Sequence, residues 1–552
     1  MMAAAAASRI VSSRASLPVV CDRRPTPPIL FHQPPPITGH RRCFSIVAPV
    51  NKNSTLQRRR PRTGQLHVAA SVAATDRRPA SSRSLVDEDT DRRRRGSQSR
   101  LAETSGRSDD DGHAGRLAAR WREIHGSGDW AGLLDPLDPA LRGELIRYGE
   151  FAQACYDGFD YDRFSPYCGS CRFPARTFFR DVGLPGAGYE VSRYLYATCD
   201  DLKLPNFGAR KHRPSDAEDK LWSEHGTFIG FVAVSTDAET ARLGRRDIAV
   251  AWRGTVTRLE WVADLTARQR RLRDMGVPCP DPRVKVELGF AELYTGKDAG
   301  CRFCRYSARE QALAEVRKLV EMYHGRGEEV SVTVTGHSLG SALAMLSAFD
   351  IAETGANGTA PVCVFSFAGP RVGNLRFRER FERELGVRAL RVVNVHDTVP
   401  RVPGVLLNEA ALPGPLLRAV DGLGGVGVYA HLGVPLALDH KASPFLKDTM
   451  DISCYHNLEA HLHLLDGFRS SGEGFRLHGR DPALVNKSAD FLREHHKVPP
   501  VWYQAENKGM VRTEDGRWVL PSRHRDIDEH PEDTDHHLRE LGLTDGVPCD
   551  WN

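Results

Sequence analysis

A Gly-x-Ser-x-Gly pentapeptide, Gly336–Gly340, is the sequence feature that most constrains how this chain can fold. The β-branched run Val330–Thr335 ends at its first glycine, and small and apolar residues at helical spacing follow it. This order predicts a strand, a sharp turn and a helix, with Ser338 at the tip of the turn. A residue at such a tip has a strained backbone, so its neighbours must be small, as glycines are. The pentapeptide alone is a common chance match, and its place between a strand pattern and a helix pattern gives it weight.

Strand-like runs alternate with helical segments along the rest of the folded chain. The alternation predicts an α/β fold whose central sheet is at least partly parallel. Helical patterns around Trp121 and over 141–156 precede most of the strands and predict an N-terminal helical cap. The predicted strands are Phe228–Ser235, Ile248–Trp252, Val330–Thr335, Val362–Phe367 and Leu390–Val395.

The charge of the chain is divided unevenly. The formal net charge is +5, but residues 1–75 contain eleven Lys or Arg and one acid, so they alone contribute +10 and the remainder carries about −5. A mildly acidic body does not favour nucleic acid as a partner.

An Ala-, Ser-, Arg- and Pro-rich leader almost without acids predicts an organelle transit peptide, for a plastid more than for a mitochondrion. The alternative is a disordered tail without targeting function.

Membrane-spanning segments and metal motifs are both weakly supported. No run of eighteen apolar residues occurs, so we expect any membrane contact to be peripheral. Two Cys-x-x-Cys pairs, Cys168/Cys171 and Cys301/Cys304, are too far apart in sequence for a usual zinc motif. A local disulfide and ordinary thiols remain as alternatives for these pairs. We therefore expect no metal and no organic cofactor.

An activated serine needs a general base and a carboxylate that orients this base. In α/β-hydrolase sheets the order along the chain is serine, acid, histidine. Asp397 is the first well-placed acid after Ser338, because it directly follows a predicted strand. The same residue also fits a turn or helix cap before Pro400. Six histidines compete for the base, and their spacing does not choose among them: His396, His431, His440, His456, His461 and His463.

The charge that develops on an ester carbonyl oxygen needs hydrogen-bond donors that are already in place, an oxyanion hole. The backbone N–H of Leu339, the residue after the serine, is expected to be one donor. We expect the other from Thr255, because the strand ending at Trp252 reaches a glycine followed by this hydroxyl residue. An ordinary strand-to-loop turn is the alternative interpretation of that segment.

Together these motifs resemble the class 3 (fungal-type) lipases, and within them the plant acyl hydrolases related to the plastid phospholipase A1 enzymes of jasmonate synthesis. The resemblance runs from about Leu117 to Val511. It implies an α/β-hydrolase fold with a mostly parallel central sheet, a helical N-terminal cap and a lid. Together with the composition of the leader, this divides the chain into a transit peptide (1–75), a disordered linker (76–116), an α/β-hydrolase lipase domain (117–511) and a C-terminal extension (512–552). The segments that carry the resemblance are Trp121–Gly126, Arg147–Asp157, Ala251–Thr255, Trp261–Leu265, Gly336–Gly340, Phe367–Asn374, Arg391–Pro400 and Cys454–His463.

By position in those motifs, the resemblance assigns the nucleophile to Ser338, the acid to Asp397 and the base to His456. It assigns the oxyanion donors to Thr255 and Leu339. Where the plant relatives usually have tyrosine, this chain has His461, a departure close to the expected base.

The resemblance also implies a lid after the oxyanion loop. Its apolar residues would be Leu259, Trp261, Val262 and Leu265, which equally fit a simple core helix.

The implied activity is release of the sn-1 fatty acid from phospholipids in a plastid, and also from galactolipids or triacylglycerol. Membrane lipids would then be the partners, contacted peripherally. Two alternatives remain open: a non-catalytic lipase-like binding module, and acyl transfer to an alcohol other than water. The sequence does not reveal the headgroup preference.

Overall fold

The computed structural model describes residues 117–161, 168–198, 226–256, 268–301, 303–404, 408–410, 415–416, 419, 427–503, 511–512 and 517–519. These residues belong to one compact unit, Asp87–Asn552. The predicted transit peptide, linker and lid residues, and most of the C-terminal extension, lie outside the described residues. Among the described helices, none has the length and apolar character needed to cross a bilayer.

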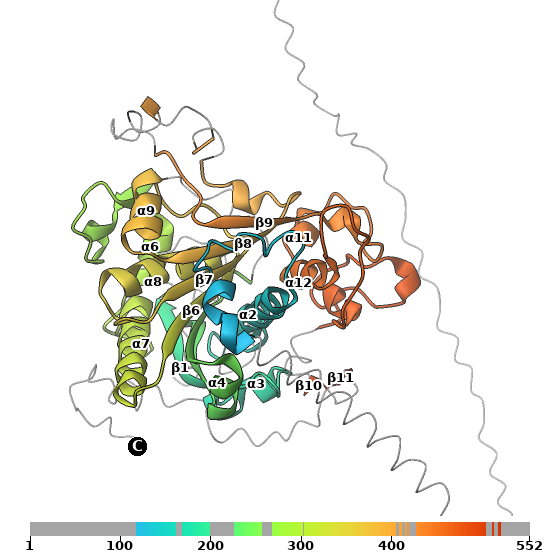
Figure 1. The fold of residues 1–552 in the computed structure, drawn as a ribbon, viewed down its shortest axis with the longest axis horizontal. Helices are drawn as coiled ribbons and strands as arrows, with labels where there is room; N and C mark the ends of the chain where they lie inside the picture. Colours follow the sequence, from blue (N-terminus) through green and yellow to red (C-terminus); the bar gives the residue numbers. More distant parts are fainter. Residues whose placement is uncertain are drawn as a thin grey trace, which may run out of the picture. The chain divides into compact units, whose positions relative to one another are not determined.

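A seven-stranded sheet forms the centre of the fold, in the order β1-β2-β3-β6-β7-β8-β9 (Figure 1). The pairs β1/β2 and β2/β3 are antiparallel, and the pairs from β3 to β9 are parallel, so the mostly parallel sheet is confirmed. The strands are β1 (Tyr189–Thr198), β2 (Gly226–Ser235), β3 (Arg246–Trp252), β6 (Val330–His337), β7 (Val362–Phe367), β8 (Arg388–Asn394) and β9 (Val434–Leu438).

The two faces of the sheet bury two separate hydrophobic cores. Successive side chains of a strand point to opposite faces, so Val332 and Val334 of β6 enter one core while Phe365 and Phe367 of β7 enter the other. Strands covered on both sides are nearly continuous apolar runs, as the sequence has them. Every residue of β3 and β6 is buried.

Helices cover both faces (Figure 1). One face packs against α6 (Leu288–Thr295), α7 (Ala308–Gly325) and α8 (Leu339–Glu353); the other packs against α2 (Pro139–Asp157) and α12 (Leu458–Gly467). The start of α2 is fixed because the Asp138 carboxylate accepts hydrogen bonds from two N–H groups of its first turn. The shorter elements are α3 (Phe178–Asp181), α4 (Asp237–Leu243), α9 (Leu375–Glu379), α11 (Ile452–Tyr455), β4 (Gln269–Arg271), β5 (Lys285–Glu287), β10 (Val511–Arg512) and β11 (Trp518–Val519).

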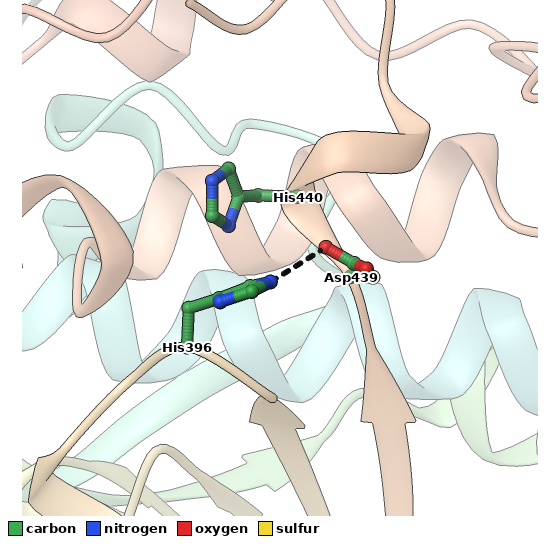
Figure 2. Close-up of side chains that lie close together, drawn as sticks. All are labelled: His396, Asp439 and His440. Carbon is green, nitrogen blue, oxygen red and sulfur yellow. Dashed lines mark hydrogen bonds and ion pairs between the residues drawn. The ribbon is translucent and has the colours of Figure 1, made fainter. Parts of the chain in front are cut away.

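The carboxyl ends of the parallel strands meet at one edge of the sheet. The loops after β3, β6 and β8 carry Thr255, Ser338 and Asp397 to this edge. The loops after β8 and β9 also meet there, and Figure 2 shows a hydrogen bond between His396 and Asp439 across them. Nε2 and Oδ1 are 3.1 Å apart.

On the opposite side of the sheet from α7 and α8, Cys301 and Cys304 form a disulfide, one of the alternatives for that pair.

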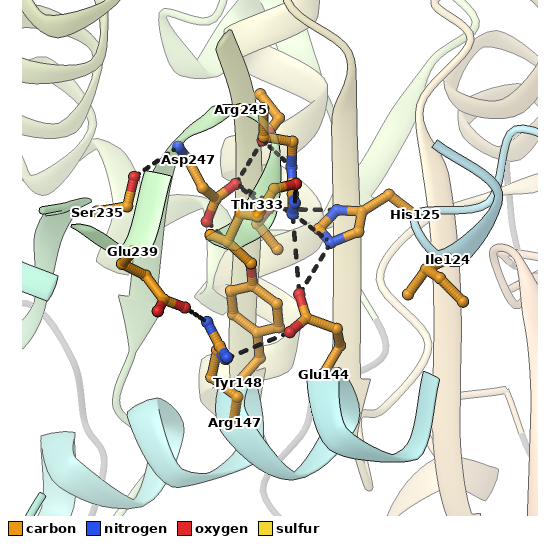
Figure 3. A network of polar contacts seen from close by, with 12 residues as sticks. Ile124, His125, Glu144, Arg147, Tyr148, Ser235, Glu239, Arg245, Asp247 and Thr333 are labelled. Atoms are coloured by element: carbon orange, nitrogen blue, oxygen red, sulfur yellow. Dashed lines mark hydrogen bonds and ion pairs between the residues drawn. The ribbon is translucent and has the colours of Figure 1, made fainter. Parts of the chain in front are cut away.

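A buried polar network fastens the N-terminal helices to the sheet (Figure 3). Its centre is Asp247 of β3, which is fully buried. Its carboxylate accepts hydrogen bonds from Tyr148 of α2 (2.9 Å), Ser331 (2.6 Å) and Thr333 (2.7 Å). Arg245 lies 3.9 Å from it and supplies the opposite charge. Since a buried carboxylate is tolerated only when it is paired, this network fixes the position of α2 on the sheet.

We predict that Asp247→Ala lowers the free energy of unfolding by about 3–5 kcal/mol, the usual cost of removing one partner from a buried charged network. Chemical denaturation would measure it. The matched control is Asp237→Ala, which removes a carboxylate paired with Arg246 but 95% exposed, and which should change stability little. Equal losses in the two variants would contradict the assigned role of the network.

Candidate active site

Ser338 occupies the sharp turn between β6 and α8, as the pentapeptide predicted. Its φ of 60° and ψ of −126° lie in a region that side-chain-bearing residues rarely adopt. Such strain persists only where the surrounding structure enforces it. The turn aims the serine away from the sheet, into a pocket at its carboxyl edge.

The two glycines of the turn are required by close backbone contacts. A Cβ on Gly340 would lie 2.3 Å from the carbonyl oxygen of Trp252, at the end of β3. A Cβ on Gly336 would lie 2.3 Å from the carbonyl oxygen of Gly340. Neither obstacle is a flexible side chain, so no larger residue fits without moving the turn.

The structure brings Asp397 and His456 together over 59 residues of sequence. His456 Nδ1 lies 2.7 Å from Asp397 Oδ2, and both residues are buried. The other oxygen of Asp397 accepts a hydrogen bond from the N–H of Val399 at 2.9 Å. The carboxylate is therefore held from both sides and leaves His456 Nε2 as the nitrogen that can face a reactant.

Ser338 and His456 line the same pocket, of about 870 Å³. Neither Ser338 Oγ nor His456 Nε2 has a hydrogen-bond partner among the described residues, although both atoms are buried. These two atoms therefore remain available to a bound molecule, and they differ from other buried unpartnered atoms of the structure in that both of their residues line one pocket. In proteins without a bound substrate, the bond between nucleophile and base is often not yet formed.

The predicted oxyanion residues lie beside the serine. Leu339 opens α8, so its backbone N–H is one of those at the helix start that have no partner within the helix. Thr255 lines the pocket. Between β3 and Thr255, Gly254 allows close approach, because a Cβ there would lie 2.6 Å from the carbonyl oxygen of His337 and 3.3 Å from Ser338 Cβ.

Sequence reasoning missed a connection that runs through His337, a variable position of the pentapeptide. His337 Nε2 donates to the backbone carbonyl of His456 at 2.8 Å, and Nδ1 accepts from the hydroxyl of Tyr156 of α2 at 2.9 Å. This tautomer follows from the carbonyl, which can only accept. Burial lowers the pKa of His337 well below its ordinary value, and the neighbouring His456 and His461 lower it further, so the ring is neutral. No motif rule identifies these contacts, because they join residues from three separate segments.

The remaining candidate histidines lie elsewhere. His461 is fully buried and does not line the pocket, and its Nδ1–H donates to the carbonyl oxygen of Asn457 at 2.8 Å. Burial lowers its pKa, while the Asp397 carboxylate opposes this shift. His463 forms a hydrogen bond with the Ser443 hydroxyl, and the ring of His396 packs edge-on against that of His440. Of the six, His456 is the one hydrogen-bonded to Asp397.

Exposed apolar side chains, here called the apolar rim, line this pocket beside the charged residues Asp157, Asp451 and Lys487. Four of the large hydrophobic residues that are exposed in the described chain line it: Tyr161, Val256, Met450 and Ile452. Met450 is 92% exposed. An apolar rim around a concave site marks a surface that meets an apolar partner.

Comparison with known proteins agrees with these observations. The sequence profile described as Lipase (class 3) matches residues 249–407. Phospholipase A1-Igamma1, chloroplastic, of Arabidopsis thaliana is 57% identical over 435 residues, covering 77% of this chain and 82% of the relative. Phospholipase A1 EG1, chloroplastic/mitochondrial, of Oryza sativa subsp. indica is 47% identical over 377 residues, covering 68% and 78%.

Solved structures give weaker matches. The lipase of Rhizopus microsporus var. chinensis aligns with a TM-score of 0.34 at 20% identity, covering 56% of this chain and 78% of its own. A likeness at this level adds nothing to the fold assignment, which stands on the sheet order and on the sequence relatives.

The strained backbone at Ser338 should affect the stability of variants at this position. Ser338→Gly should be more stable than Ser338→Ala by about 1–2 kcal/mol, because glycine removes strain of about 1–3 kcal/mol at an entropic cost of about 0.5–1 kcal/mol. Ser347, buried within α8, is the matched control: there the glycine variant should be the less stable of the two. Thermal or chemical unfolding of the four variants would measure both differences. If the glycine variant were less stable than the alanine variant at position 338 as well, Ser338 would not be strained.

Proposed function

The chain belongs to the class 3 lipase family, and from that premise we propose that it releases the sn-1 fatty acid of phospholipids by a Ser338–His456–Asp397 triad. Membership makes it a carboxylic ester hydrolase that acts on lipids. The proposal adds the residues, their roles and the position of the bond that is cleaved.

In the proposed reaction, Ser338 Oγ attacks the ester carbonyl while His456 Nε2 takes its proton. His456 then protonates the leaving alcohol, and afterwards activates the water that releases the fatty acid. Asp397 holds the imidazole with Nδ1 protonated and stabilises its charged form. The N–H of Leu339 and the donors of Thr255 stabilise the oxyanion.

The observation that carries this proposal is the 2.7 Å hydrogen bond from His456 to Asp397, together with the pocket that His456 lines with Ser338, whose Oγ has no partner among the described residues. A non-catalytic binding module has no need of a strained serine that shares a pocket with a histidine hydrogen-bonded to a buried carboxylate. Acyl transfer to another alcohol would use the same residues, so it is distinguished by its products.

The apolar rim supports a lipid substrate. Its four exposed apolar residues line the pocket that contains Ser338, and there they would contact the acyl chain or the bilayer. The relatives named phospholipase A1 support the sn-1 position of phospholipids as the bond cleaved. We extend the proposal to galactolipids and triacylglycerol, which present the same ester beside different headgroups.

The first test is acid release by the protein lacking residues 1–75, from phosphatidylcholine and a galactolipid labelled separately at sn-1 and sn-2. We expect release from sn-1. Ser338→Ala should lower the rate at least about 10⁴-fold, since loss of a triad residue leaves only binding and the oxyanion donors. Asp397→Asn should lower it by roughly 10³–10⁴-fold, because the imidazole takes the wrong tautomer.

Two results would overturn the proposal. Unchanged release by Ser338→Ala would move the nucleophile elsewhere. A folded wild-type protein that releases no acid from any of these lipids, but forms esters when an alcohol is supplied, would be an acyltransferase.

The location of the protein is the plastid, in agreement with relatives named chloroplastic. We propose that residues 1–75 are the targeting segment. Fused to a fluorescent reporter, they should direct it into plastids, while a fusion of residues 76–116 should stay in the cytosol. A cytosolic or exclusively mitochondrial signal from the first fusion would contradict this assignment.

A further inference from the structure

Three side chains able to bind a metal meet between the loops that follow β8 and β9, outside the active-site pocket (Figure 2). His396 comes from the loop after β8, and Asp439 and His440 directly follow β9. One nitrogen or oxygen atom of each lies within 4.8 Å of the others. It is the one such group of three found in the described part of the chain.

The distance between the first two side chains suits a shared cation. His396 Nε2 and Asp439 Oδ1 are 3.1 Å apart. Ligands about 2.0–2.1 Å from a tetrahedral zinc ion are separated from one another by about 3.3 Å. The two atoms therefore need to move apart only slightly to hold an ion between them. His396 is partly exposed and Asp439 is exposed, so both have room to adjust.

His440 is the fixed member of the group and is poorly satisfied by the protein itself. The residue is 2% exposed, and its ring lies 4.7 Å from that of His396, with one nitrogen turned towards the other two side chains (Figure 2). Its Nδ1 has a single long contact, 3.4 Å, with the side-chain oxygen of Asn394. Its Nε2 has no hydrogen-bond partner among the described residues but is turned away from His396 and Asp439, so Nδ1 is the nitrogen that would bind an ion (Figure 2). The contact of Nδ1 is at the long end of hydrogen-bond distances, so this buried nitrogen is weakly satisfied and would gain from a closer partner.

We propose that His396, Asp439 and His440 form a binding site for one divalent transition-metal ion, with zinc as the best match. Two imidazole nitrogens and one carboxylate are a ligand set that suits zinc and its neighbours. Calcium and magnesium prefer sites built of oxygen atoms, so two nitrogens out of three ligands disfavour them. Three protein ligands leave the fourth position of a tetrahedral ion for water.

A bound ion would join the two loops beside the proposed acid and base. His396 immediately precedes Asp397 in the chain. The ring of His440 stacks on Tyr455, with centroids 4.5 Å apart, and Tyr455 immediately precedes His456. An ion that binds only the folded protein stabilises it by mass action. The site needs no assumption about the reaction, so its test is independent of the proposed activity.

The test is calorimetric titration of the full-length protein, first treated with a chelator, with zinc chloride. We expect saturable binding of about one equivalent at this site and a rise in the unfolding temperature with zinc. His396→Ala and Asp439→Asn each remove a proposed ligand. Each should weaken zinc binding by more than about 100-fold, because losing a hydrogen bond that only supports a ligand already costs about 10–100-fold. Asparagine can still accept the hydrogen bond that Asp439 receives from the N–H of Lys441, so the local turn should survive.

Matched controls separate this site from other histidines. His495→Ala/His496→Ala removes an adjacent histidine pair outside the cluster, and His536→Ala/His537→Ala removes a pair in the C-terminal extension. Both double variants should keep the high-affinity binding. Cobalt in place of zinc should give the visible absorption of a tetrahedral ion, lost in His396→Ala. The proposal is wrong if no saturable binding occurs, or if His396→Ala and Asp439→Asn, with unchanged metal-free unfolding temperatures, bind zinc as the wild type does.

Discussion

The contact of Gly340 with the carbonyl of Trp252 is the constraint on which the site depends. Because no side chain lies between them, the first turn of α8 can rest on the end of β3, and the chain must reverse sharply at Ser338. The reversal places the serine beside the loop after β3, which carries Thr255. Parallel strands bring the loop after β8 to the same edge, and Asp397 comes with it. One close backbone contact thus determines where the other parts can meet.

The base is held from two directions that are chemically different. Asp397 binds the ring of His456, while His337 binds its backbone carbonyl. His337 is itself the residue before Ser338, so the serine and the base are connected by a path that does not pass through the acid. Tyr156 extends this path to α2, and α2 is fastened to the sheet by Tyr148 and Asp247. The N-terminal cap therefore contributes to the position of the base as well as to stability.

Local patterns predicted the parts of the fold that are determined locally. The runs of β6 and β7 and the turn at Ser338 follow from β-branched residues and from glycines at fixed spacing. β7 has its predicted bounds, and β6 continues beyond its predicted end, Thr335, to His337. β1 and β9 were missed. In β1 the polar residues Glu190, Ser192 and Arg193 interrupt the aromatic and aliphatic ones, and β9 is short and includes a proline that only an edge strand tolerates. Spacing could not choose His456 among six histidines, because the choice depends on a contact across 59 residues. The resemblance to a family supplied it. Local patterns could not predict the cluster of His396, Asp439 and His440 either, because its members come from the separate loops after β8 and β9. No metal was expected there.

Covalent labelling with a fluorophosphonate, followed by mass spectrometry, tests the central claim most directly. Trypsin releases Ser338 in one peptide, residues 327–371, which also contains Ser331, Ser341, Ser347 and Ser366 as internal controls. Fragmentation of this peptide should place the whole adduct on Ser338. An adduct on any other residue, or no adduct on a protein that hydrolyses lipid esters, would contradict the account.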